Sequence, residues 1–581
     1  MSVVTKYSPG DIFISPHWLL TLALIAAVCF GLTKTGHADS RDEGRERPKV
    51  ALVLAGGGAK GVAHVGVIKV LEEAGVRVDL IVGTSMGAIV GGLYATGLSA
   101  VELQEIVQTV DWESIFIDNT PRQELTIRRK TDDLGLLAGP VIRFKDGKAR
   151  LPLGAIKGQR LTLELQRLSQ SAAHISDFDD LPIPFRAVAT DIETGEEVVI
   201  GGGDLALAMR ASMSIPGAFP PVRLDGRTLV DGGFVNNVPI SVARSLGADT
   251  VIVAAFREQL LPVEKLTSAV SILSQSVGLM ILKSSREQLA SLDAGDVLIM
   301  IDPGDIGTAS FDRIHETIPL GEAAARAQYD QLAAVVVSGR EAPEPLVAVV
   351  WGRPIRAINI DNDSPLSDGV IRARMRLREG AALDLESLDN DIARIYGLGH
   401  FQTVTYAIDN RPEGVDLTII ARQNTAGLDQ LRIGLRLEND FDGESNYDVG
   451  VGYTRSAINE LNGVVRITGH FGTTLNLFAE FYQPMDEANR FFIAPAGRIT
   501  DRDVDVFRDG RRIAETRVAR GIASLRAGIN VTDDLATFVI VTRGVGQVRE
   551  VTGVGDIPED SFDTATIGAG LYYDNLDTLQ Y

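Results

Sequence analysis

Residues 80–90 read Leu-Ile-Val-Gly-Thr-Ser-Met-Gly-Ala-Ile-Val. The apolar first half predicts a buried strand, and the second half predicts a helix that begins directly after Ser85. Gly83 and Gly87 flank the serine in the spacing G-x-S-x-G, which is typical of a sharp strand-to-helix turn that leaves no room for flanking side chains. Such a turn holds the serine in a strained backbone conformation at the positive end of the helix. Ser85 is therefore the first candidate nucleophile.

A glycine-rich loop precedes this turn. Residues 50–54 predict a buried parallel strand, and residues 56–61, Gly-Gly-Gly-Ala-Lys-Gly, lead from it into a helix. The loop also fits the G-x-G-x-x-G dinucleotide pattern. We reject that interpretation because Asp79 precedes the next strand, whereas the acidic residue of a dinucleotide fold closes it. Instead we expect an oxyanion hole of backbone N–H groups, those of Gly56, Gly57, Gly58 and Met86.

A third motif lies downstream at residues 229–233, Leu-Val-Asp-Gly-Gly. It places Asp231 at the end of an apolar strand, although Asp-Gly-Gly is also a common hairpin turn. Glycine loop, serine turn and Asp-Gly-Gly, in this order, resemble the patatin-like phospholipases over residues 49–260. The resemblance implies a dyad of Ser85 and Asp231 without histidine. The other residues of these motifs are Lys60, Gly61, Gly83, Gly87, Gly232 and Gly233.

The histidines support a dyad independently. Of the seven, none follows an acidic residue late in the domain, as the order Ser…Asp…His of an α/β-hydrolase requires. An ordinary aspartate has a pKa of about 4, so Asp231 would accept the Ser85 proton only in concert with nucleophilic attack. Ser212 and Ser214 are rival nucleophiles, but neither has a glycine-flanked turn. Asp191 precedes a Glu-Thr-Gly turn and is interpreted as structural.

Two further features each leave two interpretations open. Lys60 either contacts a lipid phosphate or is a solvated loop lysine. The apolar residues within 112–117 form either a lipid-entry lip or part of the core, and the core is the commoner role of such a cluster.

The amino-acid composition restricts the kinds of binding partner and cofactor that we expect. The chain has 581 residues and a net charge of −21, which argues against a nucleic-acid partner and predicts repulsion from anionic lipid. Cys29 is the only cysteine. We see no loop of clustered oxygen ligands for calcium and expect neither a metal nor another cofactor.

The order of segments predicts several domains. Residues 1–38 resemble a signal peptide with an apolar core over 18–32, although a retained N-terminal anchor is the alternative. Residues 39–48 are a charged linker. Residues 49–340 predict a three-layer α/β sandwich, the catalytic domain. Its last part includes helices predicted over 266–277 and 279–289.

Residues 352–424 predict a smaller α+β unit. Its elements follow the order β-α-α-β-β, which resembles a POTRA domain, a periplasmic module that precedes outer-membrane barrels. Such a unit could also bind partners by strand addition at an exposed edge. The predicted elements lie at 355–360, 365–374, 384–396, 402–408 and 415–422.

Period-2 alternation of apolar and polar residues begins after Leu428. It covers 431–438, 447–453 and 475–481, and such segments are typical of a transmembrane β-barrel. A soluble β-sandwich is the alternative. Residues 428–581 hold roughly eight to ten strands, fewer than expected for a barrel that follows a POTRA domain, so we expect an incomplete, truncated barrel with an open edge.

These segments together resemble the patatin-type autotransporters, subclass d of type V secretion. The resemblance implies a phospholipase A-type lipid acyl hydrolase in the outer membrane of a Gram-negative-type cell, with the catalytic domain either surface-exposed or periplasmic. Expected partners are phospholipid, the outer membrane, the barrel-assembly machinery and a second copy in a homo-oligomer. The alternatives are an assembly or translocation factor with a non-catalytic binding module, and a general or lysophospholipid esterase.

Overall fold

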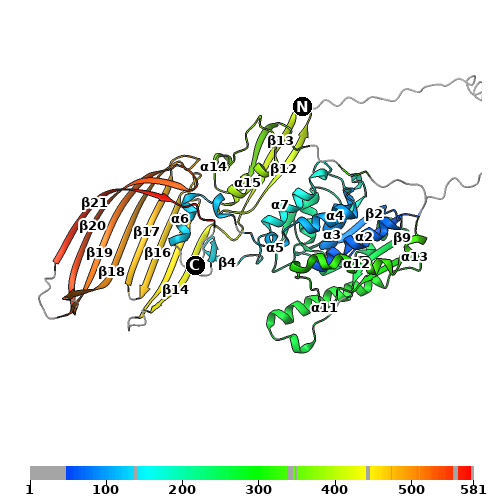
Figure 1. The fold of residues 1–581 in the computed structure, drawn as a ribbon, viewed down its shortest axis with the longest axis horizontal. Coiled ribbons are helices and arrows are strands. Elements are labelled where there is room, and N and C mark those ends of the chain that lie inside the picture. Colours follow the sequence, from blue (N-terminus) through cyan, green and yellow to red (C-terminus); the bar gives the residue numbers. More distant parts are fainter. Residues whose placement is uncertain are drawn as a thin grey trace, which may run out of the picture. The chain divides into compact units, whose positions relative to one another are not determined.

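The computed structural model describes residues 48–118, 120–135, 141–257, 260–336, 344–346, 350–439, 445–472, 474–509, 511–553 and 560–577. The predicted signal peptide, and the predicted linker except for its last residue, lie outside the described residues. Three units follow one another along the chain (Figure 1). None of the described helices combines the length and the apolar character needed to cross a bilayer.

The first unit is built on an eight-stranded sheet in the order β10-β9-β1-β2-β5-β8-β7, with β6 also paired to β5. Neighbouring strands from β10 to β5 run parallel, while β6, β7 and β8 pair antiparallel. Because both faces are covered, the apolar strand β1 is completely buried. The strands are β1 (Val50–Leu54), β2 (Leu80–Thr84), β5 (Phe185–Asp191), β6 (Glu197–Ile200), β7 (Val222–Leu224), β8 (Arg227–Asp231), β9 (Thr250–Phe256) and β10 (Val297–Ile301).

Helices cover both faces of this sheet. The crossovers β1–α2–β2 and β9–α11–β10 step across the sheet in opposite directions, and because such crossovers are right-handed, their helices lie on opposite faces. On these faces α2 packs against α12, and α10 packs against α11. The predicted three-layer α/β sandwich is confirmed. The helices are α2 (Ala63–Glu73), α3 (Met86–Ala95), α4 (Ala100–Thr109), α5 (Trp112–Ile115), α7 (Gln159–Leu168), α8 (Leu205–Ser212), α9 (Gly233–Asn236), α10 (Ile240–Ser245), α11 (Ala269–Leu289), α12 (Thr317–Arg326) and α13 (Tyr329–Ala334).

The prediction of two helices over 266–277 and 279–289 is wrong, because this region forms the single helix α11. It runs unbroken through Gly278, and it begins after Ser268, whose hydroxyl accepts a hydrogen bond from the Ser271 N–H. A glycine inside a helix costs only about 1 kcal/mol relative to alanine, which the remaining turns of a long helix offset.

The second unit is the predicted β-α-α-β-β module. Its sheet has the order β11-β13-β12, in which β11 is parallel to β13 and β12 is antiparallel to it. A separate buried apolar cluster lies between this sheet and its helices. The elements are β11 (Ile355–Asn362), α14 (Asp368–Ala373), α15 (Leu385–Tyr396), β12 (Phe401–Arg411) and β13 (Gly414–Gln423).

The third unit is a large antiparallel sheet of the eight consecutive strands β14 to β21. Among the described residues, β21 pairs only with β20, so the sheet is open, in agreement with the prediction of an incomplete barrel. The strands are β14 (Asp429–Asn439), β15 (Ser445–Arg455), β16 (Val464–Gly472), β17 (Thr474–Pro484), β18 (Phe491–Arg508), β19 (Arg511–Asn530), β20 (Leu535–Gly553) and β21 (Asp560–Tyr573).

The middle of the segment between α5 and α7 contacts the other two units, while its two ends stay packed on the first unit. We call this segment, residues 116–158, the insertion. Figure 1 shows its helix α6 beside the strands of the third unit. Its strand β3 pairs with the free side of β14, Val141 to Phe144 against Arg432 to Asp429. The elements are η2 (Arg122–Glu124), α6 (Ile127–Gly135), β3 (Val141–Lys145) and β4 (Lys148–Arg150).

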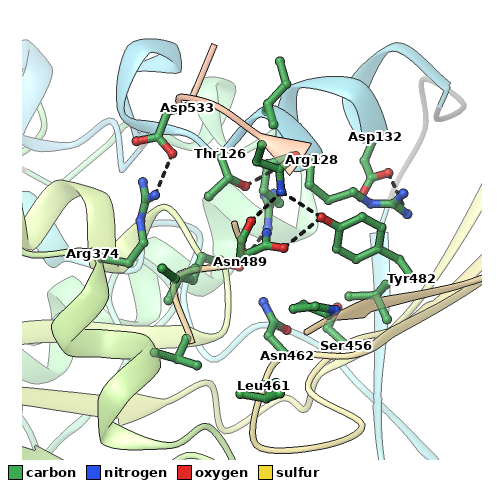
Figure 2. A pocket seen from close by; sticks show the side chains of 18 of the residues that line it. Thr126, Arg128, Asp132, Arg374, Ser456, Leu461, Asn462, Tyr482, Asn489 and Asp533 are labelled. Carbon is green, nitrogen blue, oxygen red and sulfur yellow. Dashed lines mark hydrogen bonds and ion pairs between the residues drawn. The ribbon is translucent and has the colours of Figure 1, made fainter. Parts of the chain in front are cut away.

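A cavity of about 460 Å³ lies between α6, the second unit and the turns of the third. In Figure 2, Arg374 of the second unit points toward Asp533, and Tyr482 points toward Asn489. These pairs are joined at 2.6 Å and 2.8 Å respectively. Neither Ser85 nor Asp231 lines this cavity, and its lining residues come from the insertion, the second unit and the third unit. It therefore belongs to the contact between units.

Candidate active site

Ser85 stands in a strained turn between β2 and α3. Its backbone has φ 55° and ψ −123°, a combination that is sparsely populated for a non-glycine residue. The side chain is only 4 % exposed. Its Oγ donates a hydrogen bond of 2.6 Å to Oδ2 of Asp231. The turn therefore aims the serine hydroxyl at the aspartate predicted from the Asp-Gly-Gly motif.

Asp231 is the last residue of β8 and is buried beside Ser85. Its Oδ1 accepts a 2.8 Å hydrogen bond from the Gly233 N–H, and its Oδ2 accepts the one from Ser85. Burial raises the pKa of Asp231 to about 6, although both hydrogen bonds act in the opposite direction. A carboxylate with a raised pKa holds a proton more firmly and is a stronger base than an ordinary aspartate.

Ser212, at the end of α8, holds the backbone of the serine turn through hydrogen bonds. Its hydroxyl accepts a 2.8 Å hydrogen bond from the Ser85 N–H and donates one of 2.6 Å to the Val188 carbonyl. Ser212 is thus a positioning residue for Ser85, a role that the sequence analysis missed. The two serines among apolar residues at 211–214 were a hint of such a role. Nothing in the local sequence, however, shows that the partner of Ser212 lies 127 residues earlier.

The two glycines that flank Ser85 are required by close approach. A Cβ at Gly83 would lie 2.4 Å from the Gly87 carbonyl oxygen, and a Cβ at Gly87 would lie 2.2 Å from the Leu54 carbonyl oxygen. Both distances are far shorter than real Cβ contacts. Any side chain here would therefore push β1, β2 and the start of α3 apart.

The glycine loop lies beside the serine turn. Among the described residues, the N–H groups of Gly57, Gly58 and Met86 find no acceptor, and Met86 is the first residue of α3. Gly58 has φ +58°, which favours glycine. Gly56 differs, because its N–H donates a 3.1 Å hydrogen bond to the Asn237 carbonyl. Gly56 is therefore not a free donor, contrary to the prediction.

Two basic side chains near the loop are buried. His64 contacts the Ala55 carbonyl at 2.8 Å, and burial lowers its pKa to about 4, so it is neutral at physiological pH. Lys60 is 7 % exposed, with its Nζ 5.4 Å from the ring centroid of Phe256. The interpretation of Lys60 as a solvated loop lysine is therefore wrong. His174 and His315 are exposed.

The remaining predicted features have structural roles. Asp191 accepts a 2.9 Å hydrogen bond from the Glu193 N–H, which closes the predicted turn. Phe116 packs against Phe219 and Phe311, and Ile115 is buried, so the 112–117 cluster is mainly core, with Ile117 exposed. In the part of the chain that the structure describes, no group of three His, Cys, Asp or Glu side chains is arranged to hold a metal ion.

Family comparison assigns the unit that carries this site. Residues 52–244 match the family model described as patatin-like phospholipase. These residues are a patatin-like domain. Residues 354–423 match the POTRA model, described as surface antigen variable number repeat. The patatin-like domain holds Ser85, Asp231 and the glycine loop, and the POTRA domain lies between it and the antiparallel sheet.

Individual relatives match over the patatin-like domain. Patatin-like phospholipase domain-containing protein 6 of Homo sapiens is 37% identical over 206 residues, which are 35% of this chain and 13% of that protein. An uncharacterised NTE family protein of Mycobacterium tuberculosis is 33% identical over 212 residues, 36% of this chain and 50% of that protein. The chain thus spans half or less of the length of these relatives.

Solved structures resemble parts of the chain more distantly. BamA from Haemophilus ducreyi lacking POTRA domains 1–3 gives a TM-score of 0.32 at 15% identity, covering 42% of this chain and 46% of that one. VipD from Legionella pneumophila gives 0.29 at 16% identity, covering 52% and 72%. The assignment of the patatin-like and POTRA domains rests on the sequence matches.

Proposed function

We propose that this protein is a lipid acyl hydrolase of phospholipase A type that cleaves carboxylic esters of phospholipids. The observation that carries the proposal is the 2.6 Å hydrogen bond from Ser85 Oγ to Asp231 Oδ2, made from a strained turn at the start of a helix. The match of residues 52–244 to the patatin-like phospholipase model supports the same reaction class.

In the proposed first step, Ser85 Oγ attacks the ester carbonyl carbon while its proton passes to Asp231 Oδ2. The negative charge that develops on the carbonyl oxygen is stabilised by the unpaired N–H groups of the glycine loop and of Met86. Collapse of the tetrahedral intermediate breaks the ester C–O bond. The leaving alcohol oxygen takes the proton from Asp231, and an acyl group remains on Ser85.

In the second step, water attacks the acyl carbon and gives its proton to Asp231. The acyl–Oγ bond breaks, Ser85 Oγ recovers the proton, and the fatty acid is released. Because burial raises the pKa of Asp231 to about 6, this carboxylate is better matched to both proton transfers near neutral pH than an ordinary aspartate. Every step uses only protein groups and water.

The proposed location is the outer membrane, with the catalytic domain on the periplasmic side. POTRA strand β13 ends at Gln423 and β14 begins at Asp429, so the POTRA domain adjoins the end of the sheet where β14 starts. The insertion contacts the same end, because Lys130 pairs with Asp534 in the β19–β20 turn. Protease digestion of residues 49–338 on intact cells, without permeabilising the outer membrane, would contradict this location.

The test of function is fatty-acid release from phosphatidylcholine vesicles by the full chain. Ser85→Ala and Asp231→Asn should each lower the rate by roughly a thousandfold or more. Two matched controls, Ser214→Ala and Asp191→Asn, change buried residues of the same types in the same domain and should keep the rate.

The possible results separate three functions. A folded parent that releases no fatty acid would favour the translocation factor with a non-catalytic module. A parent that cleaves short soluble esters but not vesicle lipid would favour the general esterase. Full activity in the Ser85 or Asp231 variant would exclude the dyad.

A further inference from the structure

The chain leaves the active-site edge of the sheet at Phe256 and returns to it through α11. Phe256 ends β9 and packs beside the glycine loop, with its ring 5.1 Å from that of His64. The C-terminal half of α11 lies on α9, directly after Asp231, where Ser284 Oγ donates a 2.7 Å hydrogen bond to the Val235 carbonyl. Both ends of the intervening segment are therefore held next to Ser85 and Asp231.

Between these two ends lies an apolar surface that nothing else in the described chain covers. We call residues 260–282 the α11 arm. Figure 1 shows α11 running out from the other helices of its domain. Seven large apolar side chains of the arm are between 41 % and 79 % exposed, those of Leu260, Leu261, Val263, Ile272, Leu273, Leu279 and Met280.

The charge pattern of the arm is that of a helix at an interface. Residues 266–282 carry no charge and are bounded by Lys265 and Lys283. Both lysines are exposed, and neither has an ion pair within the described ranges. Long basic side chains beside an apolar face extend their charged ends to water while their stems remain in the apolar layer. Arg286 adds a third positive charge, and Glu264 and Glu287 reduce the net charge of residues 264–287 to +1, so attraction to anionic lipid is not required.

Exposed hydroxyl groups indicate what covers the arm. Ser274 and Ser276 are exposed among the apolar side chains of α11. The Ser276 hydroxyl already donates a 2.9 Å hydrogen bond to the Ile272 carbonyl, but a dry helix–helix contact would bury the Ser274 hydroxyl and require a partner for it. The boundary between headgroups and acyl chains offers both apolar and hydrogen-bonding groups. Since Ser85 is buried and the proposed substrate resides in a bilayer, a surface beside Ser85 that enters the bilayer would bring the two together.

We infer that the α11 arm inserts into the surface of a phospholipid bilayer and holds the substrate-bearing leaflet next to Ser85. This inference rests on the proposed function for the identity of the substrate. The partner is a zwitterionic lipid surface, and binding depends on apolar burial more than on salt.

The direct test places an environment-sensitive fluorophore on the arm in the full chain, reconstituted into phosphatidylcholine proteoliposomes. Cys29, the only cysteine, is changed to serine, and the label is attached through Leu273→Cys or, as the control, Val101→Cys on α4. Both original side chains are exposed to a similar degree. Spin-labelled lipid should quench the fluorophore at position 273 and leave that at 101 unchanged.

Two results of this measurement would overturn the inference. Equal quenching at positions 273 and 101 would show that the arm is not in the bilayer. A blue shift at 273 that grows with protein concentration without lipid quenching would place a second copy of the chain on this face. Quenching does not require activity, so failure of the proposed function is recognised separately.

The activity test combines Ile272→Ser, Leu273→Ser and Met280→Ser in one variant. Hydrolysis of vesicle phospholipid should fall by roughly tenfold or more, while hydrolysis of a short soluble ester stays at the parent rate. The matched control carries three serines at exposed apolar positions away from the arm, Val101, Leu151 and Leu153, and should keep both rates. Equal loss on the soluble ester, or no loss on vesicles, would contradict the inference.

Discussion

Arg128 of the insertion and Glu480 of β17 form an ion pair of 2.7 Å between side chains that are only 9 % and 4 % exposed. Glu480 also pairs with Arg466 at 3.3 Å and with Arg526 at 2.7 Å. One buried carboxylate thus pairs with three guanidinium groups from two parts of the chain, and Asp132 pairs with two of these, Arg128 and Arg466. This network attaches the insertion, which branches from the patatin-like domain, to the antiparallel sheet.

The first prediction concerns Glu480→Gln. Removing this charge leaves Asp132 as the remaining counter-charge of Arg128 and Arg466, and the full chain should lose roughly 3 kcal/mol of stability. Thermal unfolding in detergent and the rate of proteolysis within the insertion measure the loss. Glu413→Gln, at an exposed turn, is the control. Adding Arg128→Met to Glu480→Gln should restore part of the loss, and strictly additive losses would contradict a shared network.

The second prediction is the pH dependence of hydrolysis. In the proposed mechanism Asp231 accepts the Ser85 proton only when ionised, and burial raises the pKa of this carboxyl to about 6. The rate of fatty-acid release should therefore fall as the pH drops through about 6, with the loss complete well above the pKa of an ordinary aspartate, about 4. A rate–pH profile of the parent measures this. A fall of the rate centred near pH 4 instead would show that Asp231 is not the titrating base.

The third prediction concerns the stability of Asp231→Asn. The folded pKa of Asp231 exceeds its unfolded value, so ionisation of this buried carboxyl opposes folding. The penalty is absent below about pH 4 and fully present above about pH 6. The variant should therefore be more stable than the parent at pH 8, by a value on the order of 3 kcal/mol, and gain nothing at pH 4.

Denaturant unfolding of the parent and the Asp231→Asn variant at both pH values measures this difference. Asp191→Asn, which changes another buried carboxylate of the same domain, is the control. A variant less stable than the parent at pH 8 would show that the hydrogen bonds from Ser85 and Gly233 outweigh the cost of burying the charge.

The fourth prediction concerns Ser212→Ala. Loss of the hydroxyl leaves the buried Ser85 N–H and the Val188 carbonyl without this bridge, at a cost of roughly 1–3 kcal/mol in stability. Because the turn is then less fixed, kcat should fall while KM changes little. Ser214→Ala removes an equally buried hydroxyl that is bonded to Arg210 and should keep kcat. Equal effects of the two changes on kcat would contradict a positioning role for Ser212.

Local sequence was sufficient for the serine turn and the glycine loop. Gly83 and Gly87 flank Ser85 because carbonyl groups pass where their side chains would be, and a constraint of this kind leaves a short motif in the sequence. The order of elements also predicted the three-layer sandwich, the POTRA-like module and the open antiparallel sheet, since the period of the apolar residues differs between these units.

The insertion could not be predicted, because its contacts are made with residues far away in the sequence. Lys130 is completely buried, yet its partner Asp534 lies 404 residues away, and α6 by itself reads as a polar surface helix. The α11 arm likewise reads as core from its apolar residues. Only the tertiary structure shows that the apolar side chains of the arm are exposed.

By itself, the sequence determined the strand–turn–helix at Ser85, the glycine-rich loop and the Asp-Gly-Gly motif, because each depends on backbone conformations and close approaches within a few residues. Only the tertiary structure decided that Ser85 and Asp231, 146 residues apart, meet at 2.6 Å, that Ser212 holds the turn, and that the pKa of Asp231 is raised. Those properties arise from the pairing of distant strands and from the exclusion of water, neither of which is encoded in any short stretch of residues.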